Sequence, residues 1–188
     1  MSEIVFRRLD AREMRLLYDT DLQRQFPSDE VRPWESIEPL LANGCYSGWA
    51  LESEEGILSY AFLAEVGKNA LVDYLATPDP WKSQGCGSLL LNRLRSSLMG
   101  VERVFIESED PEAPNVEDAA MARRRLAFYA RNRFGDTGVR VTLFHVVYRI
   151  LSSESGPARS EHARKGMEEV YRAIIPDRWR SRILRFHD

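Results

Sequence analysis

Residues 75–91 read LATPDPWKSQGCGSLLL, and they mark a change in the pattern of the chain. An apolar, β-prone run leads into a loop with glycine at positions 85 and 87, and leucines at helical spacing then follow. A helix that begins here presents about four backbone amides without helical partners, together with a partial positive charge. The segment therefore predicts an anion site of the kind that binds phosphate, with Lys82 as an added cation.

The residues on either side of this segment predict a mixed sheet. Three β-prone runs precede it at residues 46–52, 57–66 and 70–77, and the short turns between them indicate an antiparallel meander. The strand expected at residues 101–107 follows a helix, so it should run parallel to the strand before that helix. The other expected elements are a strand at 4–9, helices at 11–25 and 34–41, a helix after the loop at 108–118, a turn at 135–138, and two strands with a kink between them within 139–151. The helix after that loop carries Ala122, Leu126, Tyr129 and Ala130 on one face. The fold class is therefore α/β (α+β), with a mostly antiparallel sheet flanked by helices.

The chain is expected to contain one main domain and an appendage. The main domain covers residues 1–151, a linker rich in serine, glycine and proline covers 152–160, and a basic helical extension covers 161–188. The extension carries arginines, but it also carries Trp179 and Phe186, so part of it should be buried. It could close the acceptor side of a site or form a homodimer contact.

Composition limits the class of function. The 188 residues carry a formal net charge of -3, which gives no electrostatic support for binding nucleic acid or a membrane surface. Two cysteines and three scattered histidines suggest neither a metal site nor a disulfide framework. The N-terminal residues do not read as a signal peptide, and no apolar run is long enough to span a membrane. We therefore expect a cytoplasmic protein without a metal.

Two common phosphate-binding patterns do not fit the loop. A nucleotide P-loop needs Lys followed by Ser or Thr directly after its last glycine, whereas Ser88-Leu89 follows Gly87. A dinucleotide fingerprint needs glycine or alanine at position 90, which is leucine, and the strand before it belongs to an antiparallel meander.

Two segments together resemble the GCN5-related N-acetyltransferases, the GNAT superfamily. Residues 82–87, KSQGCG, are similar to the family loop Gln/Arg-x-x-Gly-x-Gly/Ala, with Lys82 as a departure that preserves a positive charge. Residues 124–134, RRLAFYARNRF, are similar to the family's Arg-Leu-x-Phe-Tyr helix, which usually ends in Gly-Phe. Arg133 stands where that glycine is expected, which leaves the turn after the helix open. The resemblance covers about residues 3–151 and implies the acyl-CoA N-acyltransferase fold, with a splayed pair of parallel strands.

The resemblance implies acetyl-CoA as co-substrate. Its pyrophosphate would bind Lys82 and the amides of Ser83, Gln84, Gly85, Cys86, Gly87 and Ser88. Its pantetheine arm would pair with the backbone of Leu75, Ala76 and Thr77, where the strands splay. Tyr129 would protonate the departing thiolate, although a core aromatic on the buried face of its helix is the other reading.

The general base is less determined than the donor site. An alkylammonium group with a pKa of about 10.4 is neutral in roughly one molecule in 2,500 at pH 7, a cost of about 4.6 kcal/mol that a nearby carboxylate can relieve. Asp73 lies inside an apolar strand on the same face as Leu75, and Glu107 and Glu109 end the neighbouring strand at period two. An ion pair or a capping contact is the alternative role for each of these carboxylates.

These observations predict an N-acetyltransferase. It would move an acetyl group from acetyl-CoA to a primary amine of a small molecule or peptide, by direct transfer in a ternary complex. The acidic residues near the expected site favour a cationic acceptor such as a polyamine, an aminoglycoside or a peptide amine. The alternative is a non-catalytic module that binds acyl-CoA as a sensor or scaffold.

Overall fold

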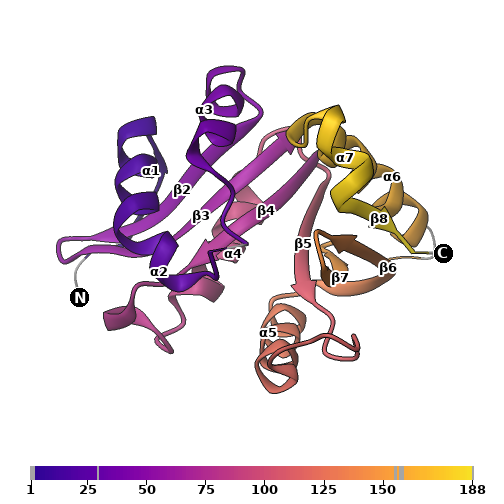
Figure 1. The fold of residues 1–188 in the computed structure, drawn as a ribbon. Helices are drawn as coiled ribbons and strands as arrows, with labels where there is room; N and C mark the ends of the chain where they lie inside the picture. Colours follow the sequence, from indigo (N-terminus) through magenta and orange to yellow (C-terminus); the bar gives the residue numbers. More distant parts are fainter. Residues whose placement is uncertain (1–2, 29, 155, 157–158, 188) are drawn as a thin grey trace. The chain divides into compact units, whose positions relative to one another are not determined.

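The computed structural model describes residues 3–28, 30–154, 156 and 159–187 (Figure 1). The chain forms two compact units. The first contains residues 1–65 and 73–99, and the second contains residues 66–72 and 100–188. The strand β4 (Asn69–Ala76) contributes residues to both units.

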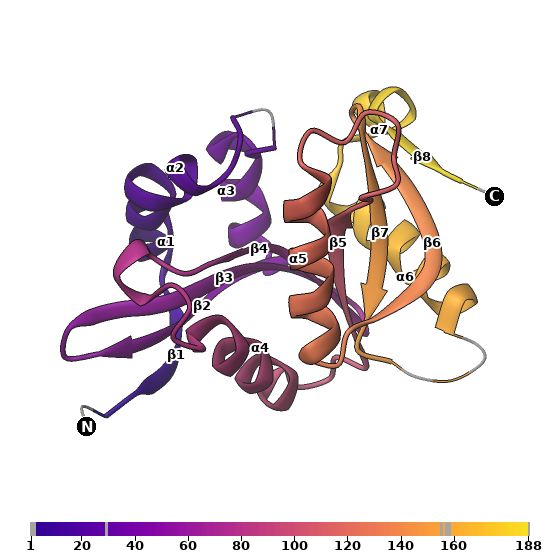
Figure 2. The same cartoon turned by 90° about the horizontal axis from the view of Figure 1, so that it is seen from below.

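The first unit contains the predicted meander with helices on both of its faces. Figures 1 and 2 show α1, α2 and α3 on one face of its strands and α4 on the other. Its elements are β1 (Val5–Leu9), α1 (Ala11–Leu17), the π-helical turn η1 (Tyr18–Leu22), α2 (Gln23–Gln25), α3 (Trp34–Ala42), β2 (Tyr46–Ser53), β3 (Gly56–Val66), the end of β4, the 3-10 turn η2 (Asp79–Trp81) and α4 (Cys86–Ser97).

Local sequence explains how this unit begins. Asp10 caps α1 by accepting a 2.8 Å hydrogen bond from the Glu13 amide, and the Glu13 carboxylate accepts one of 2.8 Å from the Asp10 amide. Gly48 then lets α1 approach β2, because a Cβ atom at this position would lie 2.6 Å from Met14 Cγ.

The second unit holds the parallel strand pair and the C-terminal residues. Its elements are the start of β4, β5 (Arg103–Glu109), α5 (Ala119–Arg131), β6 (Gly135–Leu143), β7 (Val146–Ser152), α6 (Arg159–Ile174), α7 (Asp177–Ile183) and β8 (Leu184–Phe186). Residues 69–72 pair in parallel with residues 103–106, and β5 with β7, β7 with β6, and β6 with β8 pair antiparallel. Figure 2 shows α5 in front of these strands and α6 behind them.

The strands follow the hydrogen-bonded order β1-β2-β3-β4-β5-β7-β6-β8. This confirms the predicted fold class, a mixed and mostly antiparallel sheet with one parallel pair and flanking helices. The predicted splay concerns residues 73–77 of the first unit and 107–109 of the second, and it stays a prediction.

Two local expectations were wrong. Residues 135–138 do not form a turn, because β6 already begins at Gly135 and contains a register shift between Asp136 and Arg140, with Gly138 at φ 84°. Residues 161–188 are not helical throughout, because β8 pairs with β6 through Phe186 and Val141. The two strands expected within 139–151 are confirmed, and Phe144 and His145 separate them.

The predicted extension packs on its own unit through α6. The buried side chains of α6 recur at helical spacing and include Met167, Val170, Tyr171 and Ile174. Trp179 on α7 is exposed. Residues 155, 157 and 158 of the expected linker lie outside the described residues, and the domain boundary at 151 stays a prediction. Among the described residues, no helix is long and apolar enough to cross a membrane.

Candidate functional site

The start of α4 has free backbone donors. Gly85 is the N-cap residue and offers no side chain to cap the helix. The first helical hydrogen bond runs from the Leu89 amide to the Gly85 carbonyl over 3.0 Å, so the amides of Cys86, Gly87 and Ser88 precede the first α-helical donor. Such amides favour an anion together with the helix dipole, and the anion site at this position stays a prediction.

Backbone conformation explains the glycine at position 85. Its φ of 84° and ψ of 0° lie in the left-handed region, which costs a residue with a side chain about 1–2 kcal/mol. A Cβ atom at Gly85 would meet nothing within 4 Å, so conformation, not crowding, favours glycine here. Residues 82–85 are exposed, and residues 86–88 are half-buried. An anion can therefore reach the loop from solvent.

Lys82 supplies the predicted cation at the surface. Its Nζ lies 2.7 Å from an Asp79 carboxylate oxygen, and both side chains are exposed. The hydrogen bond and charge of Lys82 hold the pKa of Asp79 below its ordinary value. Because an exposed ion pair of this kind is weak, a more highly charged phosphate can replace Asp79 as the partner of Lys82.

The strand end before the loop is fixed by a side chain on β3. The Ser59 hydroxyl donates a 2.8 Å hydrogen bond to the Ala76 carbonyl and lies 3.1 Å from the Thr77 hydroxyl. Ala76 is buried, whereas Leu75 and Thr77 are half-buried. Residues 75–77 and the loop at 82–88 both lie within residues 73–99, which form one continuous segment of the first unit.

Asp73, in the same unit, has two partners. Its carboxylate accepts a hydrogen bond from the Tyr46 hydroxyl and lies 3.3 Å from Arg32 Nε. Burial raises the pKa of Tyr46 well above its ordinary value, and the negative charge of Asp73 raises it further. Tyr46 therefore acts as a neutral donor. An ion pair, the alternative reading of Asp73, is thus present, while its role as a base stays a prediction.

Tyr129 lies on α5 in the second unit. The residue is half-buried, and its ring centroid is 5.2 Å from that of Phe128. Burial raises the pKa of the Tyr129 phenol, and the positive charge of Arg125 lowers it by less. The phenol is therefore protonated at neutral pH and can donate a proton, as the predicted role requires.

Glu107 and Glu109 lie on β5, also in the second unit. Both are half-buried, and Glu107 accepts a hydrogen bond from the hydroxyl of Tyr171 on α6. Within the part of the chain that the structure describes, no hydrogen bond or ion pair involves the Glu109 carboxylate. The two glutamates thus differ in how firmly they are held.

Similar structures agree with this arrangement of elements. A GNAT-family acetyltransferase from Bacteroides thetaiotaomicron, described as putative, superposes with a TM-score of 0.67 at 16% identity, covering 90% of this chain and 98% of that one. The chain has the GNAT fold. The ribosomal-protein-S18-alanine N-acetyltransferase of Escherichia coli gives 0.58 at 18% identity over 82% of this chain and 97% of that one. Spermidine N-acetyltransferase from Vibrio cholerae, in complex with CoA and spermine, gives 0.59 at 11% identity over 79% and 94%.

No protein-family model and no curated protein matches the sequence. The likeness therefore lies in the GNAT fold and not in overall sequence identity.

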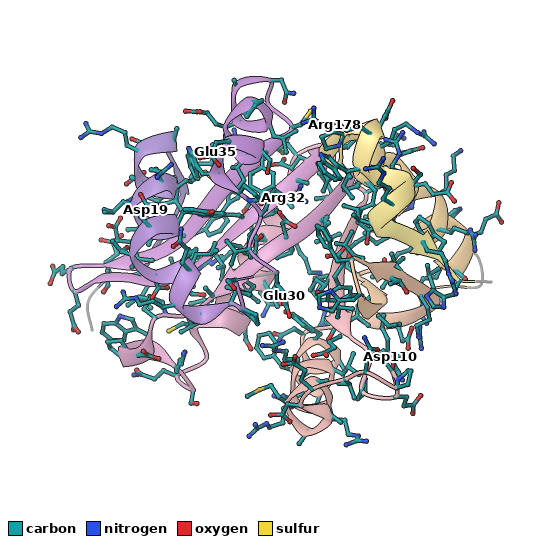
Figure 3. All side chains as sticks on the ribbon, in the orientation of Figure 1. Asp19, Glu30, Arg32, Glu35, Asp110 and Arg178 are labelled. Carbon is teal, nitrogen blue, oxygen red and sulfur yellow. The ribbon has the colours of Figure 1, made fainter. Side chains whose placement is uncertain are left out.

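Within the GNAT fold of this chain, three partners of the candidate residues were missed by sequence reasoning. They are Arg32, Tyr46 and Tyr171, each of which contacts a candidate carboxylate. Figure 3 labels Arg32 on the segment between α2 and α3, where Tyr18 and Tyr74 hydrogen-bond to its backbone. None of the three lies near its carboxylate in sequence, and no local pattern marks them.

Proposed function

We propose that this protein is an acyl-CoA-dependent N-acyltransferase that moves an acetyl group from acetyl-CoA to a primary amine. The observation that carries the proposal is the uncapped start of α4, where Gly85 in the left-handed region leads into free amides. The GNAT fold supports it, because acetyl-CoA or CoA is bound in solved structures with this fold.

The residues present suit coenzyme A. Amides of residues 83–88 and the Lys82 ammonium would hold the pyrophosphate, because free helix-start amides and a cation both favour phosphate. The backbone of Leu75, Ala76 and Thr77 would hold the pantetheine arm. When bound, acetyl-CoA supplies the acyl group as a thioester.

The chain's own residues would then prepare the amine and the leaving thiolate. A carboxylate, chosen from Glu107, Glu109 and Asp73, removes the proton from the acceptor ammonium. An amide in residues 75–77 stabilises the developing negative charge. The protonated Tyr129 phenol donates to sulfur. Because both substrates would be bound together, transfer becomes effectively intramolecular.

The acceptor class is a primary amine of a small molecule or peptide. The Vibrio cholerae and Escherichia coli structures are described as acetyltransferases of spermidine and of an alanine of ribosomal protein S18. Both acceptors are amines, which agrees with this class without selecting between polyamine and peptide. A cytoplasmic location, a homodimer and the absence of a metal belong to the same proposal.

A carboxylate placed at the start of α4 tests the donor site. Ser88 is the third residue of α4, where an aspartate should stabilise the helix by about 0.3–1 kcal/mol through the dipole. The same charge repels a pyrophosphate. We expect Ser88→Asp to raise the Kd for CoA, measured by calorimetry, at least about tenfold, while Tm stays constant or rises.

Ser88→Asn is the matched control, since it has the same shape without the charge. It should keep Kd within a few-fold of the wild-type value. An unchanged Kd in Ser88→Asp would place the pyrophosphate elsewhere. CoA binding without transfer to any polyamine, aminoglycoside or peptide would support the sensor alternative instead.

A further inference from the structure

Two large aromatic side chains of the second unit lie exposed around the end of α7. Trp179 on α7 is 47% exposed, and Phe144, in the turn between β6 and β7, is 58% exposed. The Phe144 amide donates a 2.6 Å hydrogen bond to the carbonyl of Ile183, the last residue of α7. Ile183 lies about one helical turn after Trp179 on the same side of the helix. Exposed apolar side chains that gather in this way, unlike single ones, mark a place where another molecule binds.

The backbone at Phe144 is strained. Leu143 pairs with Val146, so Phe144 and His145 form a two-residue turn, and φ at Phe144 is 55°, in the left-handed region. This conformation costs a residue with a side chain some stability, and hairpin turns normally place glycine, asparagine or aspartate there. A ring that is mostly exposed regains little of that loss by burial within the chain. Contact with a partner would give an aromatic ring at this position a function.

Two arginines flank Trp179. The guanidinium carbons of Arg178 and Arg182 lie 6.0 and 5.9 Å from the centroid of its ring, and both arginines are exposed (Figure 3 labels Arg178). Among the described residues, neither arginine forms an ion pair with a carboxylate. They are four residues apart on one helix, where two like charges destabilise each other. A negatively charged partner would relieve this repulsion.

The surrounding sequence does not supply that negative charge. Residues 171–187 contain five arginines and a single acidic residue, Asp177. Its carboxylate lies 2.5 Å from Arg180 Nη2, so it is already paired. The charge at this end of the chain is therefore positive, although the whole chain carries a net charge of -3.

We propose that the α7 surface, which consists of Phe144, Arg178, Trp179 and Arg182, binds an acidic peptide segment of a partner protein. An apolar side chain of the peptide packs between the two aromatic rings, and carboxylates on either side of it pair with the two arginines. Arginine suits this role because its planar guanidinium binds a carboxylate through two parallel hydrogen bonds. Tryptophan and arginine are also the residues that most often dominate the binding energy of protein interfaces.

A peptide fits the α7 surface better than a nucleic acid does. Two guanidinium groups already lie over the Trp179 ring, so a nucleobase can stack there only by displacing one of them. A long polyanion would also be repelled by the rest of the chain, because its net charge is negative. A short acidic segment contacts the positive surface alone.

Fluorescence anisotropy with a labelled peptide tests the proposal. The probe is a short peptide in which a leucine is flanked on both sides by aspartates and glutamates. We expect the full chain to bind it with a Kd of about 100 µM or lower. Trp179→Ala, and separately Arg178→Ser combined with Arg182→Ser, should each raise Kd at least about tenfold. Phe144→Gly should raise Kd about fivefold while Tm stays constant or rises, because glycine relieves the strained turn.

Matched controls separate this surface from general charge and stickiness. Arg123→Ser combined with Arg131→Ser removes the same charge from exposed arginines of α5, and Leu16→Ala removes an apolar side chain that is 62% exposed. Both should keep Kd within about twofold of the wild-type value. A peptide with asparagine and glutamine in place of the acids should bind at least about tenfold more weakly.

Several results would overturn the proposal. They include no saturable binding of the acidic peptide and equal Kd values for the wild type and Trp179→Ala. Tighter binding of a uridine oligonucleotide, or of phosphatidylserine vesicles, that is lost in the same variants would assign the surface to a nucleic acid or a membrane instead. Self-association in sedimentation velocity that Trp179→Ala abolishes would assign it to a second copy of the chain. Because acetyl transfer is not measured, none of these results bears on the proposed function.

Discussion

Arg133 follows α5 with a φ of 67°, in the left-handed region, and its side chain is exposed. The turn that the sequence left open is therefore made in a left-handed conformation that favours glycine, and here an arginine adopts it. That conformation costs a non-glycine residue about 1–2 kcal/mol. We expect Arg133→Gly to raise the free energy of unfolding by about 1 kcal/mol, after the entropy that glycine adds to the unfolded chain.

Urea unfolding at pH 7 measures this difference. Arg133→Ala is the control, because it removes the same exposed side chain and keeps the left-handed strain. It should leave stability close to that of the wild type. Equal stabilisation by both variants would mean that the arginine side chain, and not the backbone, is the unfavourable element.

Other residues of the candidate site were predictable only where their signal is local. Gly85 and Tyr129 lie inside short motifs, and a loop that opens a helix indicates free amides without any knowledge of the fold. Tyr171 lies 64 residues from Glu107, and Arg32 lies 41 residues from Asp73. Such pairs depend on how strands and helices pack, so sequence periodicity does not reveal them.

At the scale of elements, the predictions that were confirmed rest on local sequence signals, and those that were wrong depend on contacts between distant residues. The meander was predictable because its strands are joined by short polar turns that act locally. Glycines at 135 and 138 also suggested a turn, but pairing with β7 extends β6 through them as a bulge. The three residues of β8 form a strand because β6 offers them an unpaired edge. Those two outcomes depend on partners distant in sequence.

Close packing of α6 on β5 leads to a prediction for Gly166→Ala. Alanine normally stabilises a helix by about 1 kcal/mol relative to glycine. Here the new methyl group would overlap the buried ring of Phe105, and overpacking of this kind costs about 1–3 kcal/mol. We therefore expect no stabilisation, and a net loss of up to about 2 kcal/mol in urea unfolding.

Ala173→Gly is the control that measures the difference in helix propensity between alanine and glycine, because Ala173 lies on the exposed side of α6. It should lose about 1 kcal/mol. If Gly166→Ala instead gained that amount, α6 would not approach β5 as closely as the structure shows.

At the scale of the whole molecule, the net charge is only -3, but the second unit contains a compact network of opposite charges that this sum does not reveal. Asp110, labelled in Figure 3, lies 2.7 Å from Arg149 Nη2 and 3.0 Å from Arg140 Nε. Arg140 and Arg149 also contact Asp136, at 2.9 and 3.4 Å. The network joins the end of β5 to β6 and β7, so it ties three strands together.

The network makes the free energy of unfolding depend on pH in the acidic range. Burial alone would raise the pKa of Asp110, but the hydrogen bond from Arg149, the Glu112 amide and the two arginine charges outweigh it, so the pKa lies below its ordinary value. The balance at Asp136 has the same direction, with Arg140 as its main hydrogen-bond donor. The folded state therefore binds fewer protons than the unfolded state. The stabilisation that these two carboxylates give the folded state is complete above their unfolded pKa of about 3.9. It disappears as pH falls through their lower pKa in the folded state.

Asp110→Asn should remove this contribution selectively. The amide oxygen of asparagine can still accept from the Glu112 amide, but the charge that pairs with Arg140 and Arg149 is lost. We expect a loss of about 1–3 kcal/mol at pH 7 in urea unfolding, the range for a hydrogen bond to a charged group. The difference from the wild type should shrink as pH falls below 4, because the unfolded wild-type chain then gains a proton on this carboxylate, and it should disappear once the folded carboxylate is protonated as well. Glu112→Gln, at an exposed carboxylate that contacts the same Arg149, should cost less than about 1 kcal/mol. Suppose that the difference in free energy of unfolding between wild type and Asp110→Asn stays constant from pH 7 to 3. Asp110 would then stabilise the fold through packing and not through its charge.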